Sequence, residues 1–165
     1  MSATSKTGDL VRVSVSVRVP IEDAFRIFTE EIDHWWRRGV AYRVAGRRPG
    51  VIHFEPGLGG RLFEQFDVRG SSRLIELGRI VEWSPPAHFA FEWRGVNFAP
   101  SESTRVDVTF VAKGSGTFVE VTHGGWSQLR PDHPARHGQD VVPFIRTMGL
   151  WWGNLLTSLR LHATS

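Results

Sequence analysis

The first regular element of the chain is marked by strict alternation of apolar and polar residues. From Leu10 to Val19 the sequence reads LVRVSVSVRV, with valine at every second position and arginine or serine between. A period of two is typical of a β-strand with one face in the core and the other in water. After Pro20 the apolar residues recur at helical spacing through PIEDAFRIFTEEIDHWW, with acids in the first turn. The pattern predicts a strand followed by one or two short helices.

The middle of the chain repeats the strand pattern in shorter pieces. Residues 42–67 are interrupted by glycine and proline, which punctuate a β-meander. Residues 71–95 predict two strands around Ser84-Pro85-Pro86, and residues 103–126 predict a hairpin that turns at Lys113–Gly116. On the last strand of this series Val119, Val121 and His123 share one face.

The chain ends in a broad apolar stripe at helical spacing, which runs from residue 141 to residue 161 and predicts a long C-terminal helix. Because strand and helix do not alternate along the chain, an α+β fold is favoured over a parallel α/β sheet. A curved antiparallel sheet of six to seven strands around the C-terminal helix would cover every apolar face. We expect one domain, 1–165, with an ordered core at about 10–163 and a cavity between sheet and helix.

Composition supports one compact soluble domain, since 41% of the 165 residues are hydrophobic and 22% are charged. The aromatic side chains are nearly all apolar, with eleven Phe, seven Trp and one Tyr, as expected of a hydrophobic core or a hydrophobic cavity. A net charge of +3 without a basic tract argues against nucleic-acid binding. The lack of cysteine excludes disulfides and thiolate chemistry. With no signal-peptide pattern and no membrane span, we expect a cytoplasmic protein.

Four segments resemble a known family in their order and spacing: VSVRVPIEDAFRIFT, GGRLFE, GRIVEWSPPAHFAFEW and GTFVEVTHGGW. They are similar to the activator of heat-shock-protein-90 ATPase homologue-like branch of the SRPBCC (START-like, birch-pollen-allergen-like) superfamily. The resemblance covers about Val11 to Leu161. It implies a helix-grip fold and a cavity for hydrophobic small molecules, and some members are polyketide cyclase-like enzymes or dehydratases. The eukaryotic namesake is a co-chaperone with an additional N-terminal domain, which we expect to be missing here.

Two residues are candidates for acid–base chemistry. His123 precedes two glycines at a strand end, where an imidazole could act as a general base or could simply be a hydrogen-bonded structural residue. Glu64 shares one strand face with Leu62 and Phe66, and if that face points inward its carboxylate lies in an apolar cavity. Most other acidic residues alternate with apolar neighbours and are expected on the solvent-exposed face of the sheet.

No metal or cofactor is predicted. His123, His133 and His137 include a pair with the i, i+4 spacing of helical metal ligands. However, Pro131 and Pro134 flank His133, so the segment is expected to be a loop in which that spacing loses its geometric meaning.

The candidate ligand-binding residues are aromatic or long apolar side chains near the expected cavity. Adjacent tryptophans on a helix point in different directions, so one ring of the pair Trp35 and Trp36 is expected to face the cavity entrance or solvent. A one-residue shift in register would turn several strand residues outward. The candidates are Trp36, Phe54, Phe66, Trp83, Phe91, Trp93, Trp126, Phe144, Met148 and Trp152.

Three functions are compatible with these patterns. The first is binding of an aromatic, polycyclic or lipid-like small molecule between sheet and helix. The second is a polyketide cyclase/dehydratase-like enzyme that uses His123 or Glu64 as acid or base. The third is a co-chaperone-like or regulatory module that binds a protein partner. An exposed sheet edge could also pair two copies into a homodimer, whereas neither nucleic-acid binding nor membrane insertion is expected.

Overall fold

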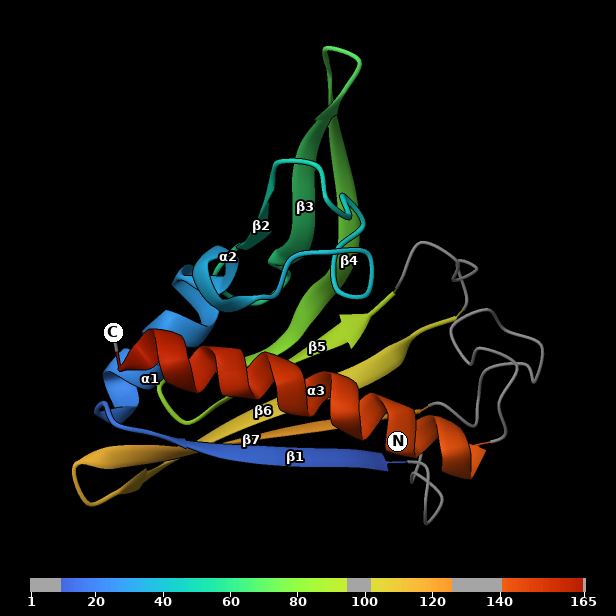
Figure 1. The fold of residues 1–165 in the computed structure, drawn as a ribbon. Helices are drawn as coiled ribbons and strands as arrows, with labels where there is room; N and C mark the ends of the chain where they lie inside the picture. The colour runs from blue at the N-terminus through green and yellow to red at the C-terminus, as the bar shows by residue number, and fades with distance from the viewer. Residues whose placement is uncertain (1–9, 95–101, 126–140, 165) are drawn as a thin grey trace.

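The computed structural model describes residues 10–94, 102–125 and 141–164, the backbone alone for residues 141–144. Seven strands and three helices form in these ranges, and Figure 1 shows their arrangement. In chain order they are β1 (Leu10–Val17), α1 (Ile21–Glu30), α2 (Ile32–Trp35), β2 (Gly50–Phe54), β3 (Arg61–Val68), β4 (Ser71–Ser84), β5 (His88–Trp93), β6 (Thr104–Lys113), β7 (Gly116–Gly124) and α3 (Val141–Ala163).

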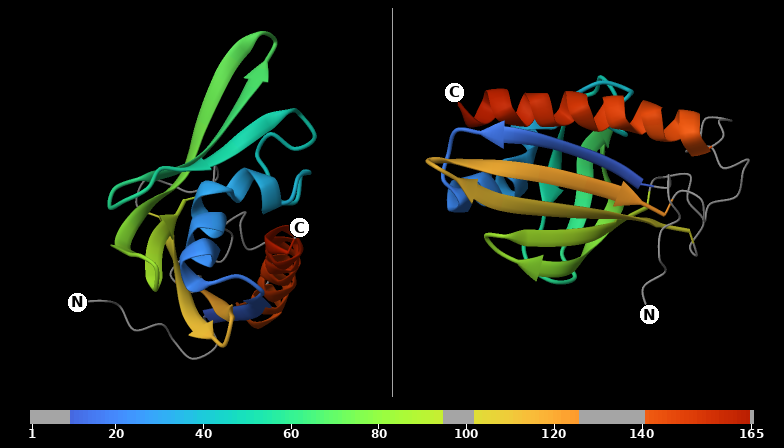
Figure 2. Two further views of the ribbon diagram at one scale, coloured as in Figure 1. Left: turned by 90° about the vertical axis from the view of Figure 1, so that its left-hand side faces the viewer. Right: turned by 90° about the horizontal axis from the view of Figure 1, so that it is seen from below.

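All seven strands belong to one antiparallel sheet with the order β1-β7-β6-β5-β4-β3-β2. The sheet curls, α3 runs along its β1 side, and α1 and α2 close one end (Figures 1 and 2). The β3–β4 hairpin projects beyond the rest of the sheet. The predicted α+β helix-grip fold is confirmed, including the two short helices after the first strand.

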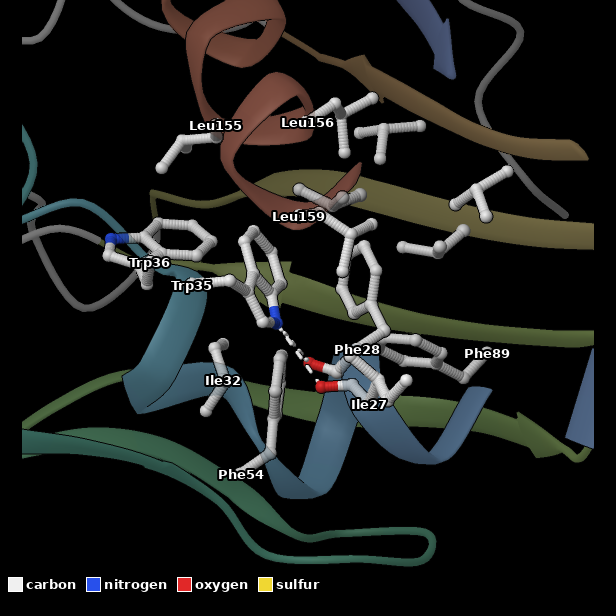
Figure 3. Packing of buried hydrophobic residues seen from close by; sticks show 14 of the residues in the cluster. Ile27, Phe28, Ile32, Trp35, Trp36, Phe54, Phe89, Leu155, Leu156 and Leu159 are labelled. Atoms are coloured by element: carbon white, nitrogen blue, oxygen red, sulfur yellow. Dashed lines mark hydrogen bonds between the residues drawn. The ribbon is translucent and has the colours of Figure 1, made fainter. Parts of the chain in front are cut away.

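The core lies between the concave face of the sheet and the three helices. In α1 the residues Ala24, Phe25, Ile27 and Phe28 are buried, while acids occupy the first turn, where they interact favourably with the helix dipole. Figure 3 shows side chains of α1, α2 and α3 meeting in this core. Burial of these apolar faces is the main force that holds helices and sheet together.

The two adjacent tryptophans are both buried, so neither ring faces solvent, which was one of the two orientations expected for one ring of the pair. Trp35 is the last residue of α2, and its indole Nε1 donates to the carbonyl oxygens of Ile27 at 3.2 Å and Phe28 at 3.3 Å (Figure 3). Trp36 already has an extended backbone, with φ −67° and ψ 120°. Both rings can be buried because the helix ends between the two residues and does not continue through both.

Register fixes which strand residues face the core. His123 of β7 lies opposite Val11 of β1 and Val106 of β6. Val119, Val121 and His123 are all buried, which confirms that they share the inner face. No described helix has the length and apolarity needed to cross a membrane.

Candidate functional site

Four tryptophans meet between the sheet and α3, and we call them the inner aromatic cluster: Trp36, Trp93, Trp151 and Trp152. Trp36 follows α2, Trp93 ends β5, and the other two are neighbours on α3. Ring centroids are 5.2 Å apart for Trp151 and Trp152, 6.2 Å for Trp93 and Trp151, and 6.4 Å for the stacked pair Trp36 and Trp93. Trp36 and Trp152 are fully buried, but Trp93 and Trp151 are only half-buried. The cluster therefore keeps accessible aromatic surface although it packs against the core.

His123 lies at the base of this cluster and is 1% exposed. The indole Nε1 of Trp152 donates to its Nδ1 at 3.0 Å, and its Nε2 lies 2.8 Å from Oγ1 of Thr104. An indole N–H can only donate, so Nδ1 must carry the lone pair and the neutral ring must carry its hydrogen on Nε2. His123 then donates from Nε2 to Thr104, which leaves the threonine hydroxyl hydrogen free to point elsewhere.

Burial lowers the pKa of His123 from 6.5 to about 3. The imidazolium is disfavoured because the surroundings that it faces are indole rings and a hydroxyl, which solvate a charge poorly. At neutral pH the ring is therefore neutral, with a lone pair directed at Trp152. This arrangement suits a hydrogen-bonding group better than a general base.

Backbone carbonyls from the segment after α2 supply the polar side of the cluster. Trp151 Nε1 donates to the carbonyl oxygen of Ala41 at 2.7 Å, and Trp36 Nε1 donates to that of Tyr42 at 3.0 Å. The Tyr42 ring stacks on Trp151 with centroids 5.7 Å apart, and Asn154 Nδ2 donates to its hydroxyl at 3.2 Å. The segment is thereby tied to α3 at several points.

A buried arginine holds the same segment from within. The Arg43 guanidinium donates to Asp33 Oδ1 at 2.6 Å and to the carbonyl oxygens of Asp33, Trp36 and Arg37. Asp33 also accepts from the backbone N–H of Ile52 at 3.0 Å. The pKa of Asp33 is lowered by these hydrogen bonds and by nearby arginine charge, against the opposing effect of desolvation by burial. One network therefore links α2, the following segment and β2.

Glu64 lies inward on β3 and is buried, beside Leu62 and Phe66 on the same face. Its carboxylate accepts from the backbone N–H of Val44 at 2.7 Å and from that of Ala45 at 3.1 Å. Two backbone donors on one carboxylate are a sufficient structural reason for a buried acid. Glu64 as acid or base stays a prediction.

The structure gathers only some of the candidate ligand-binding residues. Trp36, Trp93, Trp152 and His123 come together. Phe54 and Phe91 pack on each other, with centroids 5.2 Å apart, inside the general core, and Phe66 is buried on β3. Met148 is partly buried against the core from α3. The candidate Trp126, the side chain of Phe144 and the histidines His133 and His137 lie outside the described residues.

Trp83 lies elsewhere, in edge contact with Phe25 of α1 at 5.1 Å, near the start of β5 rather than its end. Sequence reasoning missed Thr104, Tyr42 and Trp151. The alternation Thr104, Val106, Val108 on β6 places the threonine on the inner face and could have identified it. The positions of Tyr42 and Trp151 depend on long-range contacts that no local pattern carries.

One group of potential metal ligands occurs in the described ranges: one ligand atom each from Glu82, His88 and Asp107, all within 4.8 Å of one another. Arg105 forms ion pairs with both acids, at 2.9 Å to Glu82 and 3.0 Å to Asp107. Because the guanidinium already supplies the positive charge between the carboxylates, the group is accounted for without a metal ion.

Comparison with known proteins identifies the family. The family model described as Activator of Hsp90 ATPase homolog 1-like protein matches residues 18–159. The chain belongs to this family. No curated protein matches the chain.

Solved structures similar to this Activator of Hsp90 ATPase homolog 1-like protein have the same fold. An anthrahydroquino-γ-pyrone synthase, Txn09, solved in complex with a ligand, is 30% identical, with a TM-score of 0.57 over 92% of this chain and 94% of that one. Protein NE0264 from Nitrosomonas europaea is 15% identical, with a TM-score of 0.63 over 98% of both chains. The Aha1 dimer from Colwellia psychrerythraea is 15% identical, with a TM-score of 0.59 over 92% of both. The last two share the fold with this chain.

Proposed function

We propose that this protein binds a planar polycyclic aromatic molecule against the inner aromatic cluster. The observation that carries the proposal is the partial exposure of Trp93 and Trp151, whose rings pack against the core yet remain accessible. Large apolar side chains on the concave side of a sheet are normally buried, so accessible rings there are typical of a ligand site. Similarity to a synthase named for an anthrahydroquinone-type compound supports a fused-ring ligand.

The polar groups around the cluster fit such a ligand. A planar ring system could stack on the indole of Trp93, and burial of its faces would supply about 25 cal/mol per Å² of apolar area. The hydroxyl of Thr104 accepts from His123 and is buried, so a ligand carbonyl or phenol oxygen that reaches past the rings of the cluster could accept its hydrogen. A few fixed polar groups in an apolar wall are what orient a ligand in such sites.

Tryptophan fluorescence tests the proposal, with dihydroxyanthraquinone as the probe. We expect quenching on titration, and we expect Trp93→Leu to weaken binding by about tenfold because one stacking face is lost. Phe118→Leu is the matched control, since Phe118 is also a half-buried aromatic residue and lies on the outer face of β7, away from the cluster. Equal affinities for the wild type and both variants, or equal losses in both, would contradict the proposal.

A second candidate is a cyclase-like enzyme that closes rings on the same ligand. It is favoured by the 30% identity to a synthase across nearly the whole of both chains. In that reaction His123 would hold Thr104 in place, and the threonine hydroxyl would stabilise negative charge that develops on a ligand oxygen. His123 would then be a positioning residue rather than the base.

Mass spectrometry of products from the substrate of that synthase separates binding from turnover. For an enzyme we expect an anthrahydroquino-γ-pyrone product, and we expect Thr104→Val to reduce kcat far more than it weakens dihydroxyanthraquinone binding. Binding of the anthraquinone without any product would leave the binding function and exclude this enzymatic one.

A further inference from the structure

A second cleft lies at the opposite end of β5 from the inner aromatic cluster. It has a volume of about 490 Å³ and is formed by α1 and by the turn between β4 and β5. Trp83, which lines the cleft, pairs with Phe89 at the start of β5, whereas Trp93 is at the end of that strand. The volume falls within the range of small-molecule sites.

The floor of this cleft is apolar and aromatic. The buried ring of Phe25 meets the half-buried indole of Trp83 edge-on, with centroids 5.1 Å apart. Pro85 and Pro86 extend the apolar surface along the turn, and neither carries a backbone N–H that a ligand would have to satisfy. An indole with one face available attracts flat apolar groups and also cations.

The rim of the cleft carries a net negative charge, since two carboxylates and one guanidinium line it. Glu22, Arg26 and Glu30 follow each other at i, i+4 spacing on α1, and all three line the cleft. Arg26 forms ion pairs with Asp23 at 3.8 Å and with Glu31, and the hydrogen bond to Glu31 is the main cause that raises its pKa. Among the described residues neither Glu22 nor Glu30 forms an ion pair. The rim is therefore acidic on a chain whose net charge is +3.

We propose that this cleft binds a small organic cation with an aromatic or other apolar body. The apolar body would lie over Trp83 and Phe25, and the ammonium group would lie at the rim beside Glu22 or Glu30, away from the Arg26 guanidinium, which pairs with Asp23 and Glu31. The indole quadrupole and the two carboxylates both favour a positive charge at that place, and an anion of the same shape meets repulsion from both. The proposal does not depend on what the inner aromatic cluster binds.

Three probes with one apolar body and different charges test the site: phenylbutylamine, phenylbutanol and phenylbutyrate. In titrations followed by NMR, we expect the amine to bind about tenfold more tightly than the alcohol, since cation–π attraction and the two carboxylates act together. The butyrate should bind more weakly than either. The indole N–H signal of Trp83, assigned with Trp83→Phe, should shift with the amine, while that of Trp93 should stay in place.

The double variant Glu22→Gln, Glu30→Gln keeps the shape of the rim and removes its charge. We expect it to lower the affinity for the amine to that of the alcohol and to leave the alcohol unchanged. Glu92→Gln is the control, because Glu92 is an exposed acid on β5 outside this cleft. The proposal is overturned if the amine binds no better than the butyrate, if the double variant binds the amine like the wild type, or if the shifts appear at Trp93 instead.

Discussion

Among single residues, Arg43 carries the clearest structural role. Its side chain is 2% exposed and makes hydrogen bonds to one carboxylate and three carbonyl groups, so its charge is compensated on all sides. Arg38 binds the same aspartate, Asp33, at 3.4 Å, but its side chain is 56% exposed. The two arginines therefore allow a comparison of a buried and an exposed ion pair on one carboxylate.

We expect Arg43→Met to lower the free energy of unfolding by about 3 kcal/mol, because it leaves Asp33 and three carbonyl groups without their buried donor. Arg38→Met should cost less than about 1 kcal/mol, since water and salt already screen that pair. Urea unfolding of both variants measures the difference. Equal losses would show that burial is not what gives Arg43 its importance.

The face on which Glu64 lies could be predicted from the sequence, but its hydrogen-bond partners could not. Alternation along β3 was sufficient to place Glu64 on a face with Leu62 and Phe66. It did not reveal the partners of the carboxylate, because Val44 and Ala45 lie 20 and 19 residues away on a segment without periodicity. Contacts between a side chain and a distant backbone depend on the path of a loop, which local pattern does not encode.

At the scale of elements, the β3–β4 hairpin differs from its neighbours. β4 has 14 residues and β5 has 6, so residues 71–76 of β4 pair with β3 alone. This part projects from the body in Figures 1 and 2 and is mostly exposed. Strand alternation predicted the hairpin but not its projection, because projection depends on how far the neighbouring strand extends.

Shortening this hairpin should therefore leave the fold nearly intact. Deleting Asp67, Val68, Ser71 and Ser72 removes two cross-strand pairs, keeps the Arg69-Gly70 turn and preserves the alternation of faces. We expect the free energy of unfolding in urea to change by less than about 1 kcal/mol, because little apolar surface is lost.

The β6–β7 hairpin gives the matching control. Deleting Val111, Ala112, Thr117 and Phe118 also removes two cross-strand pairs. Thr117 is buried and donates to the carbonyl oxygen of Val19 at 2.8 Å, so this deletion should cost more than about 2 kcal/mol. A larger loss from the β3–β4 deletion than from this one would mean that the projecting hairpin contributes to the core.

At the scale of the whole molecule, the order of elements was enough to predict the fold. Each apolar face required a partner, and a curved antiparallel sheet around one long helix was the arrangement that supplied all of them. The same reasoning could not tell which aromatic residues converge. Trp36, Trp93 and Trp152 come from three separate parts of the chain, and whether they meet depends on where α2 ends and on the rotation of α3.

The pH dependence of global stability tests the buried His123. Its pKa falls from 6.5 to about 3 on folding, so between these values the unfolded chain binds a proton that the folded protein does not. The free energy of unfolding therefore rises with pH. The stabilisation that comes from a neutral His123 is present above pH 6.5 and is lost progressively as the pH falls below it. Above about pH 5 carboxylates contribute little, since their ordinary values lie near 4 and that of Asp33 is lowered further.

We expect the free energy of unfolding to fall more steeply as the pH drops below 6.5, with a slope that approaches about 1.4 kcal/mol per pH unit near pH 5, as measured by urea unfolding. His123→Phe should remove this slope. It should also cost about 1–3 kcal/mol at neutral pH, because Trp152 and Thr104 lose their partner. His34→Gln removes an exposed imidazole on α2 and should keep the slope. If His123→Phe and the wild type lose stability in parallel on acidification, His123 becomes protonated in the folded protein, and the imidazole would then be accessible enough for proton transfer.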